Sequence, residues 1–178
     1  MGKHALRGLV LLVVIGLLGL GSYAIARGGT KNFNGSPLNG YEENPDVSSV
    51  ASGSFEARLS KDGASLHYKL SYSGLEADAT QAHVHFGKPA VNGGVSYFLC
   101  NGPTTPPCPT RSGTVEGDIE PADVIGPTVQ GIAPTEFAEI LAAMRAGHAY
   151  ANVHSSKFPN GEIRAQINNR HGGDGDDD

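Results

Sequence analysis

Apolar and polar residues alternate with a period of two along most of the middle of the chain. This pattern is typical of β-strands that bury one face and leave the other polar. The first such segment carries Phe55, Ala57 and Leu59 on its apolar side, and Asp62-Gly63 then supplies the turn of a hairpin. The alternation predicts strands at residues 54–59, 65–70, 81–86, 95–99, 148–154 and 162–167, with a weaker one over 111–116.

One segment changes to the period of a helix. Pro134 opens it and Gly147 ends it, as expected of helix termini. Its apolar residues fall at i, i+3, i+4 and i+7, and we expect this stripe to pack on the core: Phe137, Ile140, Leu141 and Met144. Short strands with a single helix predict an all-β fold, a Greek-key β-sandwich or barrel with one short packed helix.

Composition agrees with one globular domain. The chain has 178 residues, of which 39% are hydrophobic and 17% charged, which suits a folded core. The 25 glycines and 11 prolines favour many tight turns over a helix bundle. The formal net charge is −5 and there is no basic run, so nucleic acid is not expected as a partner.

The two ends of the chain differ from its middle. Residues 1–26 contain two cations, an apolar stretch and the triplet Ala24-Ile25-Ala26, which predicts a signal peptide or, if uncleaved, an N-terminal membrane anchor. Cleavage would leave Arg27 as the first residue of the secreted protein. Either way the domain is expected to be secreted, periplasmic or on the cell surface. Residues 27–35 are interpreted as a linker, and residues 169–178 as a disordered acidic tail.

The chain has two cysteines, separated by a turn-forming insert that is rich in proline. In an oxidising compartment Cys100 and Cys108 are expected to form a disulfide. A metal site is the alternative, but no histidine lies near the two thiols in the sequence.

Five segments of the chain form a recognisable set: A-H-V-H-F-G at 82–87, V-N-G-G-V at 91–95, F-L-C at 98–100, G-H-A-Y-A-N-V-H at 147–154 and F-P-N-G-E-I-R-A-Q-I at 158–167. Together they resemble the CHRD domain, the repeat unit first described in chordin. The resemblance covers about residues 36–168, and the only departure noted is Ala165, where the family commonly has glycine. It implies an extracytoplasmic binding or structural module. In chordin the domain belongs to a secreted protein that binds growth factors, whereas bacterial relatives mostly have no assigned activity. The partner here, a protein or a small ligand, is not specified.

The histidine segments are also similar to those of copper-zinc superoxide dismutases. This second resemblance implies that His83, His85 and His154 bind copper, or zinc. Arg164 would either support the ligands without touching the ion or guide anions to the site. Two histidines at i and i+2 share one face of a strand, and imidazole suits both metals. No histidine lies between His85 and His148, so the bridging histidine and the zinc loop of a dismutase are missing. The fold implied is superoxide-dismutase-like or immunoglobulin-like.

A second interpretation of these residues needs no metal. His83 and His85 would then hydrogen-bond to Gln81, Asn152 or Glu162 and join neighbouring strands. Glu162 and Arg164 are then a structural pair in the last strand. His148 is expected to be partly exposed, and His67 is expected to lie at the surface. No G-x-S-x-G or H-E-x-x-H motif is present, so nothing in the sequence indicates hydrolase activity. A surface adhesion or matrix role is a further possibility if the N-terminal segment is retained.

Overall fold

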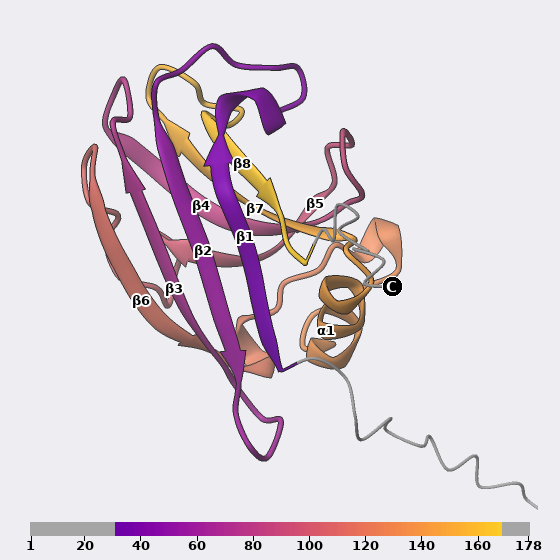
Figure 1. The fold of residues 1–178 in the computed structure, drawn as a ribbon. Helices are drawn as coiled ribbons and strands as arrows, with labels where there is room; N and C mark the ends of the chain where they lie inside the picture. Colours follow the sequence, from indigo (N-terminus) through magenta and orange to yellow (C-terminus); the bar gives the residue numbers. More distant parts are fainter. Residues whose placement is uncertain (1–30, 169–178) are drawn as a thin grey trace, which may run out of the picture.

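The computed structural model describes residues 31–168, and these residues form one nearly closed β-barrel (Figure 1). Its eight strands make a single antiparallel sheet in the order β5-β4-β7-β8-β1-β2-β3-β6. The strands are β1 (Asn32–Asn39), β2 (Ser52–Leu59), β3 (Leu66–Ser73), β4 (Ala79–Phe86), β5 (Gly94–Cys100), β6 (Gly113–Ile119), β7 (Ala149–Ser155) and β8 (Ile163–Gln166). The edge strands β5 and β6 approach each other, which almost closes the barrel. The predicted all-β class is confirmed.

The predicted alternation fills the barrel interior. Phe55, Leu70, Val84 and Ile163 come from four different strands and are fully buried. Tyr68 on β3 donates a hydrogen bond of 2.5 Å to the Leu99 carbonyl on β5, linking strands from the two sides of the opening. The sheet therefore has one continuous apolar core, as a barrel requires.

The helix α1 (Phe137–Arg145) is shorter than the sequence suggested. It begins three residues after Pro134 because Thr135 has a left-handed φ of 71°, which a helix does not allow. Its apolar stripe is buried as predicted, and α1 packs beside β7 and near the start of β1 (Figure 1). Within residues 31–168 there are also three short 3-10 helices: η1 (Gly40–Glu42), η2 (Pro121–Asp123) and η3 (Thr128–Gln130).

The linker predicted over residues 27–35 is too long, because β1 begins at Asn32. Phe33 is fully buried and pairs with Ala57 on β2. The strand lies between β2 and β8 and is therefore an inner strand of the sheet. The pattern was obscured because Gly35 and Pro37 interrupt the alternation, and the pairing with β2 shifts register between Gly35 and Leu38.

The two chain ends predicted to carry a signal or anchor (1–26) and an acidic tail (169–178) lie outside the described residues. Among residues 31–168, no helix has the length and apolar character needed to cross a membrane.

The predicted disulfide is present between Cys100 and Cys108, whose Cα atoms lie 5.0 Å apart. It closes the loop that follows β5. Asn101 supports the same loop, because its Oδ1 accepts a hydrogen bond of 3.0 Å from the Cys108 amide and its Nδ2 donates one of 2.9 Å to the Thr80 carbonyl. The loop is thus anchored to β4 as well as closed by the disulfide.

Replacing Cys100 and Cys108 together by alanine should lower the free energy of unfolding by about 2–3 kcal/mol or less, because the closed loop is short. Urea unfolding of the oxidised protein and of the double variant measures the difference. Thiol titration of the denatured, unreduced protein should find no free sulfhydryl. Two titratable thiols in protein purified from an oxidising compartment would contradict the bridge.

Two loops cover the outer face of β4, β7 and β8. They are the loop after β1 (residues 40–51) and the loop after β4 (residues 87–93). Asn44 and Asn92 join them: Asn44 Nδ2 donates 3.0 Å to the Ala90 carbonyl, and Asn92 Nδ2 donates 2.7 Å to the Asn44 carbonyl. Polar side chains beneath these loops are therefore buried although they point away from the barrel core.

Candidate metal centre

Three histidines converge on the outer face of β4 and β7. His83 and His85 project from β4 and His154 from β7. One ring nitrogen from each lies within 4.8 Å of the others. His83 Nδ1 and His154 Nε2 are only 3.1 Å apart. The structure thus gathers all three predicted ligands at one place.

Backbone carbonyls orient two of the three rings. His85 Nδ1 lies 2.9 Å from the Gly93 carbonyl, and His154 Nδ1 lies 2.9 Å from the Pro159 carbonyl. A carbonyl only accepts, so Nδ1 carries the proton in both rings and each Nε2 presents a lone pair. His83 Nδ1 then donates to His154 Nε2 in the metal-free protein. Such carbonyl contacts commonly orient metal-binding histidines.

Burial keeps the three imidazoles neutral. Loss of solvation, reinforced by the neighbouring histidines, lowers the pKa of His83 to about 3. Loss of solvation lowers the pKa of His85 to about 4, and burial lowers that of His154 as well. A histidine binds a metal through its neutral form, so the site is ready for an ion without losing protons at neutral pH.

His85 provides the most direct indication of a ligand. Its Nε2 is buried and has no hydrogen-bond partner within residues 31–168, although burying an unpaired polar atom is costly. Its ring stacks on Tyr150, with centroids 4.7 Å apart and an interplanar angle of 2°. Phe98 packs edge-on against His83 with centroids 4.6 Å apart. His154 is the most exposed of the three, so an ion would enter from its side.

Arg164 lies behind Tyr150 rather than at the open side of the cluster. Its guanidinium carbon is 3.4 Å from the centroid of the Tyr150 ring. His85 stacks on the same ring, and the two groups have room only on opposite faces. The guanidinium donates hydrogen bonds of 3.3 Å to the Lys88 carbonyl, 3.1 Å to the Val91 carbonyl and 3.4 Å to Asn92 Oδ1. Arg164 therefore holds the loop that presents Gly93 to His85.

The metal-free interpretation paired Glu162 with Arg164, but Glu162 has other partners in the structure. Its carboxylate accepts hydrogen bonds of 2.7 Å from Ser49 Oγ and 2.9 Å from the Glu76 amide. His83 forms its side-chain hydrogen bond with His154, which joins β4 to β7, and His85 contacts the Gly93 carbonyl. The predicted joining of neighbouring strands is therefore present, with His154 as the partner of His83.

Glu43 and Tyr150 belong to the site but were not predicted. Glu43 is buried, and Asn152 Nδ2 donates a hydrogen bond of 3.1 Å to its Oε1. Burial raises the pKa of Glu43 to about 7. Gly161 makes room for this contact, because a Cβ there would lie 2.5 Å from Glu43 Oε1 and 2.4 Å from Asn152 Nδ2. Strand parity places Tyr150 and Asn152 beside His154, whereas no local pattern marks Glu43.

A family model described as the CHRD domain matches residues 35–167. The chain belongs to the CHRD domain family. The match runs from β1 to the end of β8 and includes all three histidines. No curated protein and no solved structure gave a significant match.

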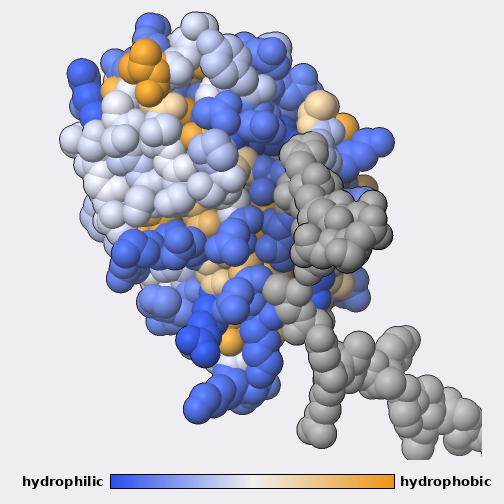
Figure 2. Space-filling model, in the orientation of Figure 1, coloured by the Kyte–Doolittle hydropathy of each residue, from blue (hydrophilic) through white to orange (hydrophobic). Residues whose placement is uncertain are grey.

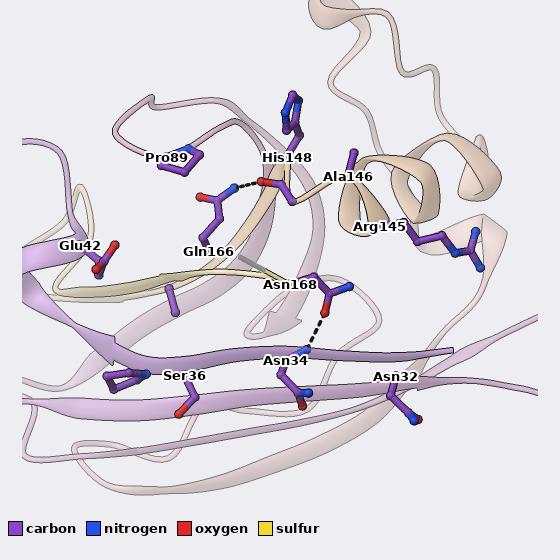
Figure 3. A pocket seen from close by; sticks show the side chains of 13 residues that line it. Asn32, Asn34, Ser36, Glu42, Pro89, Arg145, Ala146, His148, Gln166 and Asn168 are labelled. Carbon is purple, nitrogen blue, oxygen red and sulfur yellow. Dashed lines mark hydrogen bonds between the residues drawn. The ribbon is translucent and has the colours of Figure 1, made fainter. Parts of the chain in front are cut away.

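The CHRD domain also carries a polar cleft of about 970 Å³ that none of the three histidines lines (Figure 3). It lies between β1, β8 and the end of α1. Gln166 Nε2 donates a hydrogen bond of 2.7 Å to the Gly147 carbonyl, and the Asn34 amide donates one of 3.2 Å to Asn168 Oδ1. His148 lines this cleft and is exposed, as predicted.

Acid should destabilise the metal-free CHRD domain through its buried histidines. Their folded-state pKa values, about 3 for His83 and about 4 for His85, lie below the ordinary 6.5. Below pH 6.5 the unfolded chain therefore binds protons that the folded protein does not, and stability falls as the pH drops toward 4. Glu43 acts in the opposite sense, because its raised pKa adds stability as the pH falls from 7 to 4.5.

Each fully shifted group changes the free energy of unfolding by up to about 1.4 kcal/mol per pH unit, so the three buried histidines together outweigh the one glutamate. Urea unfolding of metal-free protein between pH 6.5 and 4.5 measures this slope. Glu43→Gln removes the opposing contribution, and its slope should be steeper than that of the wild type. Stability that does not change with pH over this range would show that the histidines are not buried as neutral rings.

Proposed function

We propose that this CHRD domain is an exported metal-binding module that holds one copper or zinc ion between His83, His85 and His154. The observation that carries the proposal is the buried, unpaired Nε2 of His85 beside two other neutral imidazoles. A metal ion would satisfy that nitrogen, and the contacts to Gly93 and Pro159 already hold two rings in the required tautomer. Membership in the CHRD family supports the broader role of a binding or structural module.

The donor set favours copper and zinc over harder ions. Imidazole nitrogen suits both, and in the general order of divalent affinities copper exceeds zinc. With three histidine ligands, a coordination position of the ion stays available for another donor. An available position is typical of metal sites that bind a further ligand or catalyse a reaction, whereas structural metal sites are closed. Copper handling or redox chemistry is therefore the activity to test once the ion is bound.

The proposed location is outside the cytoplasm. Residues 1–26 have the charge and apolar pattern of an export signal or anchor. The disulfide between Cys100 and Cys108 fits an oxidising compartment. Hydrophilic and neutral residues cover most of the face drawn in Figure 2, with small, separate apolar spots.

Calorimetric titration of the metal-stripped protein with Cu²⁺ and with Zn²⁺ tests the proposal. One ion should bind per chain, and the melting temperature should rise with metal concentration, because a ligand that binds only the folded state stabilises it. The matched control replaces His67 and His148, the two exposed histidines within residues 31–168, with glutamine. It should bind as the wild type does. Absence of stoichiometric binding in the wild type, or its loss in this control, would overturn the proposal.

A further inference from the structure

Asn152 occupies the central position among the three histidines. It lies directly opposite His83 in the pairing of β4 with β7 and two residues before His154 on the same face of β7. His85 is its diagonal neighbour, because His85 pairs with Tyr150. The Asn152 side chain is 2% exposed. A polar group in this position is enclosed by the cluster and by the loops above it.

Glu43 determines which way the Asn152 amide points. Asn152 Nδ2 donates a hydrogen bond of 3.1 Å to Glu43 Oε1, so the nitrogen is the end turned toward the glutamate. The other end, Oδ1, is buried and has no hydrogen-bond partner among residues 31–168. Most buried side-chain oxygens have a partner, so an oriented amide oxygen without one requires an explanation.

His85 Nε2 is a second buried acceptor without a partner, and it lies near Asn152. The two residues are diagonal neighbours on the same outer face of the paired strands β4 and β7. The Nδ1 proton of His85 is already committed to the Gly93 carbonyl. In the other tautomer the proton would lie on Nε2 and could be donated to Asn152, but an unprotonated Nδ1 would then face the Gly93 carbonyl. Protonation of both nitrogens would give a buried charged ring, which burial opposes. A cation lying between the two acceptors satisfies both.

We propose that the Asn152 Oδ1 atom faces the bound ion and supplies an oxygen donor beside the three histidine nitrogens. This inference rests on the proposed metal site and adds a residue to it. Glu43 is a positioning residue that acts through Asn152, and the absence of a side chain at Gly161 leaves room for their contact. An amide oxygen is a harder donor than imidazole, so Asn152 should favour divalent ions over Cu⁺.

The test compares Asn152→Leu, which has a similar size but no oxygen, with the wild type. Calorimetry should show Cu²⁺ binding about 10–100-fold weaker in the variant, the usual effect of losing a group that supports a metal site. The Cu²⁺ electron paramagnetic resonance spectrum should change its hyperfine splitting, and the affinity for Cu⁺ relative to Cu²⁺ should rise. A purely structural role would alter neither the spectrum nor that ratio.

Three further variants make the test independent of folding. Asn152→Asp keeps an oxygen at the same place and should retain tight Cu²⁺ binding. Glu43→Gln can still accept from Asn152 Nδ2 and should resemble the wild type, whereas Glu43→Leu frees the amide and should shift in the direction of Asn152→Leu. If Asn152→Leu does not fold, the Glu43→Leu and Glu43→Gln pair measures the same effect.

The outcomes separate this inference from the proposed function. Equal Cu²⁺ affinity and an unchanged spectrum in Asn152→Leu, or in Glu43→Leu where the first variant does not fold, would overturn the role of Asn152 and leave the three-histidine site intact. A wild-type protein that does not bind copper or zinc would instead overturn the site itself.

Discussion

Replacing His85 by alanine should abolish stoichiometric copper binding. His85 Nε2 is the buried nitrogen without a partner, and its removal leaves His83 and His154 as the remaining histidine ligands, which already contact each other at 3.1 Å. We expect the affinity for Cu²⁺ to fall by at least about 100-fold, since three histidine ligands are reduced to two. The fold should survive, because the ring lies on the outer face of β4 and not in the barrel core.

Calorimetry measures the loss of binding, and circular dichroism with thermal unfolding checks the fold. His148→Ala is the matched control, because His148 is exposed and lines the polar cleft instead of the cluster. It should bind copper as the wild type does. Wild-type affinity in a folded His85→Ala protein would rule out the proposed site.

The strands could be predicted because most of them have one face in the core. Phe55, Ala57 and Leu59 on β2 all lie inside the barrel, so their spacing in the sequence reports the structure directly. β1 was missed over its first half because Gly35 carries no side chain to continue the pattern, and Pro37 breaks it. The closure of the sheet could not be predicted, because a period of two specifies which face is buried and not how far the sheet curls.

The candidate site was predictable to the extent that it follows strand parity. His83 and His85 share a face of β4 by their spacing, and the resemblance to dismutases placed His154 beside them. Their burial was not predictable, because it depends on loops 40–51 and 87–93, which cover the outer face through contacts between distant segments. Glu43 lies 109 residues from Asn152 in the sequence, and nothing local marks it as a partner.

The surroundings of Arg164 also could not be predicted from the sequence. Its place on β8 assigned it to the outer face, where an arginine is ordinarily exposed, yet it is 1% exposed. The resemblance to dismutases suggested an anion guide at the open side of the metal site. The structure instead stacks its guanidinium on the face of Tyr150 opposite His85, with its hydrogen-bond donors directed to loop 87–93. The anion-guide role stays a prediction without geometric support.

Arg164→Met should lower the free energy of unfolding by about 2–3 kcal/mol, because it removes the charge-assisted hydrogen bonds that Arg164 donates to the Lys88 and Val91 carbonyls. Methionine keeps much of the side-chain volume, so the loss reports the guanidinium and not a large cavity. Arg111→Met is the matched control. Arg111 pairs with Asp78 at 3.0 Å, but both side chains are more than half exposed, and the expected cost is about 1 kcal/mol or less.

Arg164→Met should also weaken metal binding, because Arg164 holds the loop that orients His85. Without Arg164 the Lys88 and Val91 carbonyls lose their donor, and the loop that presents the Gly93 carbonyl to His85 Nδ1 is held less firmly. A less firmly oriented His85 should bind Cu²⁺ about tenfold more weakly, the lower end of the range for supporting residues. Urea unfolding and calorimetric titration measure the two effects separately. If the free energies of unfolding of Arg164→Met and Arg111→Met differ by less than about 1 kcal/mol, the guanidinium does not hold the loop. If Arg164→Met is destabilised but binds copper as the wild type does, the loop does not orient His85.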